Sequence, residues 1–198
     1  MPPLPKIAIG FRVHSGWAAL VAVTGSPAQP VILDRRRIQI AAAPVSGPVQ
    51  PYHTARDLGV VRGRVFLDEC REAWKAVASA SLAGAIKSIG GDRVQVCAVL
   101  TGSGRSSPTL EATLASHAAI HTAEGVLFRE IVIHAGESCG LRVHRIKEKE
   151  LFHLAEQKFE MPSASLHRTL DDLREIVGPP WQQDQKFAAL AAWLAAAY

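Results

Sequence analysis

The sequence is poor in cysteine, with only Cys70, Cys97 and Cys139 among its 198 residues. They are odd in number and widely spaced, so they form neither the framework of a disulfide-rich protein nor the paired spacing of a zinc site. Cys97 also lies in an apolar pattern that is typical of a buried strand. These features predict an intracellular protein with free thiols.

Segments that would direct the chain to a membrane are also missing. The apolar run FAALAAWLAAAY at the C-terminus has about 12 residues, whereas a bilayer-spanning helix needs about 20. The opening MPPLPKIAIG lacks the basic region and the long apolar run of a secretory signal. We therefore expect a cytoplasmic protein with no membrane partner.

The charge balance permits an anionic partner without requiring one. The net charge is +4, the pI is near 9.2, and apolar residues make up 48% of the chain. A mildly basic surface attracts nucleic acid, but it is equally typical of soluble proteins with no such partner. The length suits one domain over residues 1–198 with a sizeable core.

The apolar pattern predicts an α/β fold. We expect an antiparallel meander of three strands, followed by helices alternating with two further strands and then by helices within 150–198. The predicted strands cover 6–13, 16–24, 31–40, 93–100 and 141–146, and the predicted helices cover 65–89, 110 to about 135, 150–159, 166–176 and 184–198. Residues 41–63 are predicted to be a long loop, of the kind that is either functional or disordered.

The stretch from Leu114 to Leu151 organises this prediction. It reads as a long helix, a turn, a strand and the start of another helix. The predicted core stripe of the first helix passes through His121, Gly125 and Phe128 at steps of three or four residues. We expect Gly125 to permit close approach of the helix to a sheet, and Gly136 and Gly140 to end the helix.

Three segments carry a resemblance to RuvC-type Holliday-junction resolvases, which belong to the ribonuclease H-like superfamily. The opening KIAIGFRVHSGWAALVAV is similar to that family's first two strands, with Gly16-Trp17-Ala18 at the start of the second. His121-Thr122-Ala123-Glu124-Gly125 is similar to its Gly-x-Ala-x-Gly helix, and residues 141–147 to the strand and lysine that follow. The resemblance implies a ribonuclease H-like mixed sheet with helices on both faces.

The carboxylates that the resemblance implies for a two-metal active site are missing from this sequence. Nucleases of this family hold two Mg²⁺ ions with carboxylates on the first strand, at the end of the fourth strand and in the last helix. Gly10 stands at the first of these positions, the fourth strand RVQVCAVL has no acid, and Asp92 lies at its wrong end. Asp184 begins the last helix, where helix-end electrostatics alone explains a carboxylate. We therefore predict a degenerate active site.

Basic and polar residues are expected at the same edge of the sheet. Arg12, His14 and Ser15 follow Gly10, and Ser103 and Arg105 lie in the loop after the fourth strand. Lys186 lies at the start of the last helix. Such a group would bind a phosphate or a nucleic acid, and the ordinary alternative is a solvated rim.

A second group predicts a different chemistry. His117, His121 and Glu124 lie one and two turns apart on one helix, and two imidazoles and a carboxylate are ligands for a transition metal. The alternative places His121 in the core, with Glu124 paired to a cation such as Arg129.

Three functions follow from these patterns. The first is a catalytically degenerate RuvC-like protein that binds nucleic acid or another phosphate-bearing ligand. The second is a divergent metal-dependent phosphodiesterase or nuclease using His117, His121 and Glu124. The third is a scaffold for homo-oligomerisation or partner binding, with an apolar face at Trp193 and Tyr198. No cofactor is expected, except a divalent metal under the second hypothesis.

Overall fold

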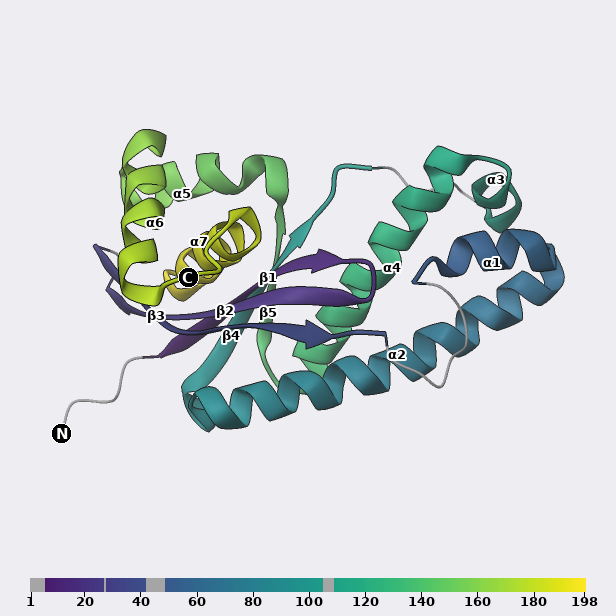
Figure 1. The fold of residues 1–198 in the computed structure, drawn as a ribbon, viewed down its shortest axis with the longest axis horizontal. Coiled ribbons are helices and arrows are strands. Elements are labelled where there is room, and N and C mark those ends of the chain that lie inside the picture. The colour runs from purple at the N-terminus through teal and green to yellow at the C-terminus, as the bar shows by residue number, and fades with distance from the viewer. Residues whose placement is uncertain (1–5, 27, 42–48, 105–108) are drawn as a thin grey trace.

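A five-stranded mixed sheet organises the protein in a computed structural model that describes residues 6–26, 28–41, 49–104 and 109–198 (Figure 1). The strand order is β3-β2-β1-β4-β5, with β1, β2 and β3 antiparallel and β4 and β5 parallel to β1. The strands are β1 Ile7–His14, β2 Trp17–Ser26, β3 Gln29–Gln39, β4 Val94–Thr101 and β5 Arg142–Lys147. The predicted α/β architecture, a meander plus two parallel strands, is therefore confirmed.

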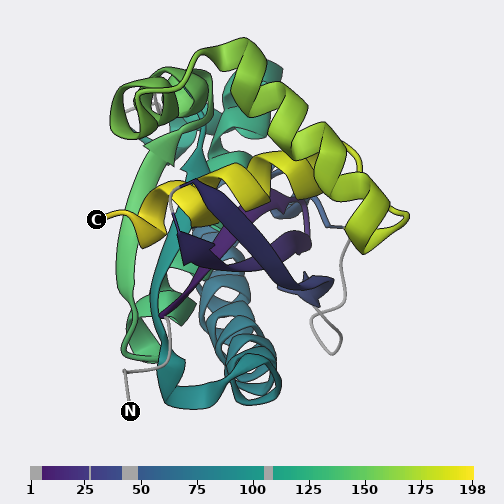
Figure 2. The same cartoon turned by 90° about the vertical axis from the view of Figure 1, so that its left-hand side faces the viewer.

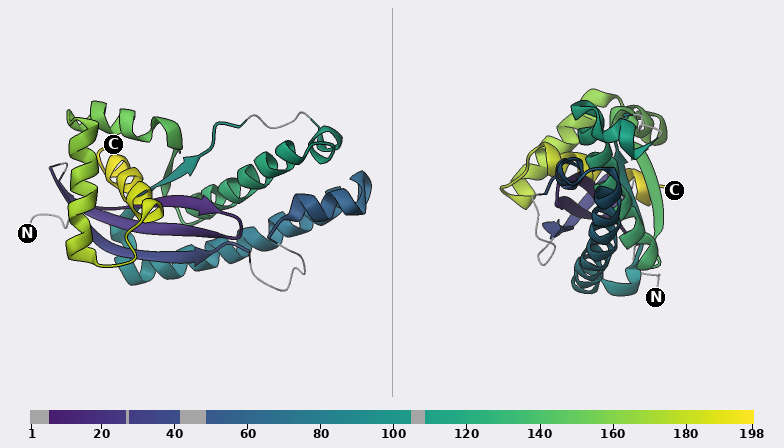
Figure 3. Two further views of the ribbon diagram at one scale, coloured as in Figure 1. Left: turned by 45° about the horizontal axis from the view of Figure 1, so that its top comes forward. Right: turned by 90° about the vertical axis from the view of Figure 1, so that its right-hand side faces the viewer.

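Helices cover both faces of the sheet. They are α1 Pro51–Leu58, α2 Val60–Ile89, α3 Leu110–Leu114, α4 His117–Ser138, α5 Leu151–Phe159, α6 Ser163–Val177 and α7 Gln183–Ala196, with short 3-10 turns at Gly91–Arg93 and Glu148–Glu150. Helix α7 crosses one face beneath α5 and α6 (Figure 2). Helices α2 and α4 cover the other face and extend beyond it, and α1 and α3 lie at their far end (Figure 3). No helix in the described part of the chain is long and apolar enough to span a membrane.

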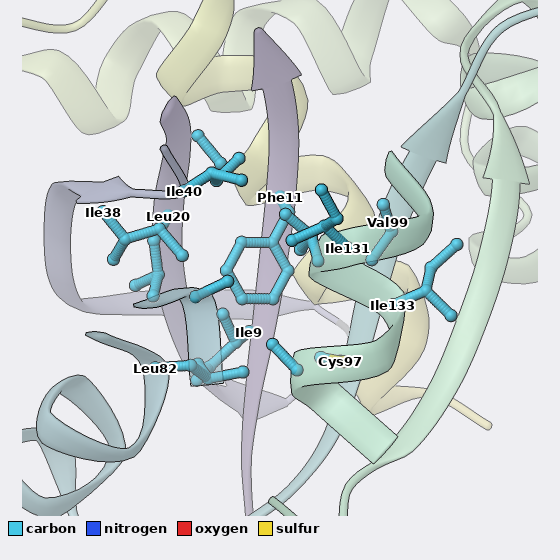
Figure 4. Close-up of a cluster of buried hydrophobic side chains, with 14 of the residues drawn as sticks. Ile9, Phe11, Leu20, Ile38, Ile40, Leu82, Cys97, Val99, Ile131 and Ile133 are labelled. Atoms are coloured by element: carbon cyan, nitrogen blue, oxygen red, sulfur yellow. The ribbon is translucent and has the colours of Figure 1, made fainter. Parts of the chain in front are cut away.

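The side chains of β1 alternate between the two faces of the sheet, which explains why two hydrophobic cores form. Ile7, Ile9 and Phe11 belong to the core on the side of α2 and α4 and are completely buried with Leu82. Figure 4 shows Ile9, Phe11 and Leu82 in this cluster. The alternate residues of β1 face α7, because successive side chains of a strand point to opposite faces. Helix α7 is buried on all sides from Ala188 to Ala195, which requires the alanine-rich sequence found there. Of the two residues in the predicted apolar face, Trp193 is only 3% exposed and belongs to the core, whereas Tyr198 is 55% exposed.

The predicted loop at 41–63 was wrong in its second half. Residues 51–58 form α1, which begins with a proline in its first turn, and α2 already begins at Val60. Gly59 separates them with a φ of 77°, a conformation that glycine adopts readily. A Cβ at Gly63 would lie 2.5 Å from the Ala55 carbonyl oxygen, so the glycine permits the close packing of α1 on α2.

The predicted long helix starting at residue 110 is two helices. Ser116 is extended, and its hydroxyl accepts a hydrogen bond from the Ala119 amide, so it caps a new helix at His117. The helix approaches the sheet at Gly136, where an added Cβ would lie 3.0 Å from Cys97 Sγ, rather than at the predicted Gly125. Gly136 therefore lies inside α4, which ends at Ser138.

The core face of α4 also differs from the predicted stripe. It passes through Ile120, Glu124 and Leu127, and His121 is exposed. The alternative that placed His121 in the core is therefore wrong. Glu124 pairs with a histidine of α1 and not with Arg129, the cation named as an example of its partner.

Candidate functional site

The parallel pairing of β1 and β4 brings two strand ends to one edge of the sheet. Arg12 and His14 lie at the end of β1, Thr101 ends β4, and Glu148 follows β5 directly. A cleft of about 550 Å³ opens there. It is lined by Arg12, Val13, His14, Thr101, Gly102, Ser103, Arg129, Glu148, Lys149 and Phe187. This edge is where the resemblance placed the metal-binding carboxylates.

An arginine fills the centre of this edge. Arg12 Nη2 and Nε donate to the two carboxylate oxygens of Glu148 at 2.8 and 3.1 Å, in a forked arrangement. Arg12 Nη1 donates to Asp184 Oδ1 at 2.6 Å, and His14 Nε2 lies 2.9 Å from the same oxygen. The described acids at this edge are thus engaged by Arg12 and His14.

These contacts shift the protonation equilibria of the group. The hydrogen bond to Glu148 is the largest cause that raises the pKa of Arg12. Burial acts to raise the pKa of Asp184, but the hydrogen bonds from Arg12 and His14 outweigh it and hold that pKa below its usual value. Arg12 is therefore a fixed cation, and Asp184 is a carboxylate at neutral pH.

Gly10 leaves no room for the missing carboxylate. A Cβ at this position would lie 1.9 Å from the carbonyl oxygen of Ala188 and 2.7 Å from the backbone nitrogen of Ala192. Both atoms belong to the backbone of α7, which cannot rotate out of the way as a side chain can. An aspartate at this position is therefore excluded by the packing of α7 on β1.

Arg129 is a cation of a different kind, because no hydrogen bond or ion pair holds it within the described ranges. Its half-buried guanidinium lies between Gly102 and Gly125, where an added Cβ would be 3.1 and 2.9 Å from Arg129 Nη1. Burial lowers its pKa, against the attraction of Glu148. Gly125 thus accommodates a guanidinium group on the surface of α4, and the arginine is left with unused donors.

Arg129 joins two cavities. It lines the cleft at the strand ends and also a neighbouring cavity of about 340 Å³. That second cavity is lined by Thr101, Gly102, Gly104, His121, Thr122, Gly125, Val126, Arg129 and Glu130. An anion in either cavity would therefore meet the same guanidinium.

Only some of the predicted anion-binding residues lie together in the structure. Arg12, His14 and Ser103 line one cleft. Ser15 is exposed in the turn between β1 and β2, and Lys186 pairs with Asp171 on α6 at 2.5 Å. Arg105 lies outside the described residues.

The predicted metal residues lie together at the far end of α4. His117 Nε2 and His121 Nε2 are 3.0 Å apart, and His121 Nδ1 is 3.8 Å from Glu124 Oε2. Glu124 is only 3% exposed, and its other oxygen, Oε1, lies 3.1 Å from Nδ1 of His53 in α1. His53, His117 and His121 each offer a ligand atom within 4.8 Å of the others.

Sequence reasoning missed His53, Glu148 and Arg129 as site residues. His53 is distant in the chain from α4 and lay in a predicted loop. Glu148 lay in the alternating charges of the Lys147–Glu150 run, which is typical of a solvated helix start. One signal for Arg129 was available, since Gly125 lies four residues before it and therefore on the same helix face.

Comparison with solved structures identifies the fold. No family model matches the sequence, and no curated protein is similar to it. Two solved structures of RuvC from Thermus thermophilus are similar over 98% of this chain and 94% of theirs. The one in complex with a Holliday junction substrate has a TM-score of 0.53 at 14% identity, and the other a TM-score of 0.55 at 12% identity. The ribonuclease H-like, RuvC-type fold predicted from the sequence is thus confirmed.

Proposed function

We propose that this protein binds nucleic acid through its phosphate backbone at the surface around Arg129, and does not cleave it by a two-metal carboxylate mechanism. The observation that carries the proposal is the half-buried Arg129 guanidinium, which has no anionic partner in the described part of the chain and opens onto two adjoining cavities.

Arg129 has the properties of a phosphate-binding group. A guanidinium remains charged at any physiological pH and presents a planar fork of donors that matches phosphate oxygens. Gly102 and Gly125 restrict its position without consuming its donors. The exposed Lys149 adds a second cation along the same cleft. A phosphate group is the ligand that best satisfies both charges.

Arg12 was predicted from the sequence to bind a phosphate, but it is less suited to this role than Arg129. Its formal charge and those of Glu148 and Asp184 sum to −1, and all three groups already satisfy one another. A Mg²⁺ ion would have to displace the forked Arg12–Glu148 pair, and it would find no carboxylate at Gly10. These two features support the absence of two-metal cleavage.

The similarity to an RuvC structure that contains a Holliday junction guides the choice of ligand to test. Labelled four-way-junction DNA, duplex DNA, single-stranded DNA and RNA would be titrated at several salt concentrations, with and without Mg²⁺ or Mn²⁺. We expect binding that weakens with salt, because each neutralised phosphate releases counterions. We expect no metal-dependent cleavage of any substrate.

Arg129→Met tests the residue, with Arg168→Met as the matched control. Arg168 is an exposed arginine on α6, so both variants lose one positive charge. Arg129→Met should weaken binding several-fold to all sequences and reduce the salt slope by about 1, and Arg168→Met should change neither. Absence of binding at low salt, equal losses in both variants, or cleavage that is lost in Asp184→Asn would overturn the proposal.

A further inference from the structure

Three imidazoles from two helices converge where α1 packs against the start of α4. The ring centroids of His117 and His121 are 4.4 Å apart, and those of His53 lie 5.5 and 5.1 Å from them. The rings are inclined at 83°, 78° and 58°, so they approach from different directions and do not stack. One nitrogen of each ring lies within 4.8 Å of a nitrogen of the other two, so the three rings can share one ion.

The separation of the nitrogens fits a metal ion. Two nitrogens bound to one tetrahedral Zn²⁺ at 2.0–2.1 Å lie about 3.3 Å apart. His117 Nε2 and His121 Nε2 are 3.0 Å apart, close to this value. The two histidines are also i and i+4 on one helix face, the spacing that places two side chains on the same ion.

Glu124 supplies a second, independent observation. Burying a carboxylate costs free energy unless it is hydrogen-bonded or paired, so its position beside His53 and His121 needs a compensating partner. Its oxygens face the Nδ1 atoms of His53 and His121 at 3.1 and 3.8 Å. The hydrogen bond from Nδ1 of His53 to Glu124 favours the tautomer with the proton on that atom and leaves Nε2 as the ligand atom, as in the carboxylate–histidine pairs behind many metal ions.

We propose that His53, His117 and His121 bind one transition-metal ion of the Zn²⁺ class, with Glu124 as the outer carboxylate that orients His53 and faces His121. Imidazole ligands select Zn²⁺, Co²⁺, Ni²⁺ or Cu²⁺ over Mg²⁺ and Ca²⁺, which require oxygen. This site is separate from the sheet edge where the resemblance placed Mg²⁺, and it does not depend on the nucleic-acid proposal.

The coordination sphere has an open position. His117 is exposed, and the His121 side chain is 50% exposed, so three protein ligands leave the fourth position to solvent or to an anion. His121 also lines the cavity that contains Arg129. The ion would join α1 to α4 and present a cationic centre at one side of that cavity.

Metal binding would be measured on tag-free protein that has been treated with a chelator. Titration with Co²⁺ should give the visible absorption of a tetrahedral or five-coordinate nitrogen site at one ion per chain, and Zn²⁺ should displace it. Mg²⁺ should produce no signal. X-ray absorption of the zinc-loaded wild type should show three histidine ligands, and this measurement needs no variant.

Variants assign the ligands. His53→Gln, which keeps a hydrogen-bonding side chain, and His121→Ala should each weaken Zn²⁺ binding at least about 100-fold. Glu124→Gln should weaken it about 10–100-fold, as expected for an outer-shell group. The control is His134→Ala, on α4 but about 20 Å along the helix from His121, which should bind Zn²⁺ as the wild type does. Far-UV circular dichroism would confirm that each variant is folded.

Several results would overturn this proposal. One is a stoichiometry below one ion per chain in the wild type. Another is a zinc spectrum with fewer than three histidines. A third is an equal loss of affinity in His134→Ala and His121→Ala, since that would indicate non-specific binding to surface histidines.

Discussion

Replacing Gly10 with alanine should severely destabilise the protein, although it adds only one methyl group. The added Cβ would lie 1.9 Å from the Ala188 carbonyl oxygen, whereas non-bonded heavy atoms in contact are separated by about 3.5 Å. Helix α7 would therefore have to move about 1.5 Å away from β1. Because α7 is buried on all sides from Ala188 to Ala195, this movement would disturb the sheet on one side and α5 and α6 on the other.

The magnitude follows from the packing. Inserting a methylene into a packed core costs about 1–3 kcal/mol, and more where the neighbours cannot rearrange. The neighbours of Gly10 are backbone atoms of a buried helix, so we expect a loss of at least about 3 kcal/mol in the free energy of unfolding. For a chain of 150–250 residues, about 2–4 °C of melting temperature is lost per kcal/mol, which gives a decrease of about 6–12 °C.

Urea unfolding followed by circular dichroism would measure this loss. Gly84→Ala is the matched control, because Gly84 lies exposed within α2 and an added Cβ would meet no atom within 4 Å. That substitution should stabilise the protein by about 0.5–1 kcal/mol, since alanine is the better helix former. If Gly10→Ala unfolds within 1 kcal/mol of the wild type, the argument that α7 excludes a carboxylate from β1 is refuted.

Three further results are expected. The pKa of Asp184 is lowered because the hydrogen bonds and charges of Arg12 and His14 together outweigh burial. The contribution of Asp184 to stability is therefore complete above the pKa of an unfolded aspartate, about 3.9, and is lost as the pH falls through the lower folded value. Urea titrations between pH 6 and pH 2 should show a shallower loss in Arg12→Met, and an unchanged slope would contradict the pairing. Burial raises the pKa of Cys97 to about 12, so iodoacetamide at pH 8 should modify this thiol only after denaturation, as mass spectrometry of the native and unfolded protein would show. Ser116→Ala should cost about 1 kcal/mol in unfolding free energy, because the cap of α4 is lost, and a neutral effect would contradict the break between α3 and α4.

The sheet could be predicted from the sequence because its strands carry strong local signals. β1 and β2 are apolar runs joined by a two-residue turn, and β4 is buried at nearly every position. The order of the turns and helices that follow these strands is compatible with only a few sheet topologies. The order of the elements, together with the resemblance, was therefore sufficient to predict a ribonuclease H-like sheet.

Helix α1 could not be predicted in the same way because its stability is tertiary. An isolated helix of eight residues is unstable in water, and α1 depends on its packing against α2 through Ala55 and Gly63. Both residues are small, so they contribute little to an apolar pattern. With α1 read as a loop, His53 had no predicted position near α4.

The face of α4 was misread for a related reason. Periodicity assigns apolar residues to the core and charged residues to solvent, whereas α4 buries Glu124 and exposes His121. Such departures from a local rule concentrate at functional sites, where the cost of burying a charge is offset by a bound ligand or a defined partner. The misreading of α4 therefore coincides with the candidate metal site.

These observations indicate that the groups able to bind a ligand lie along α4 and not at the strand ends where the resemblance placed them. At the strand ends Arg12 engages Glu148 and Asp184, and the backbone of α7 closes the position of Gly10. Along α4, in contrast, no hydrogen bond or ion pair within the described ranges holds the Arg129 guanidinium, and the three histidines each offer a ligand atom within 4.8 Å of the others. Both adjoin the cavity that His121 and Arg129 line, and a metal ion at one side of that cavity would add its charge to that of the guanidinium. An oxyanion is the ligand that such a pair of cations would hold, so zinc-loaded protein should bind a phosphate-bearing ligand more tightly than the metal-free protein.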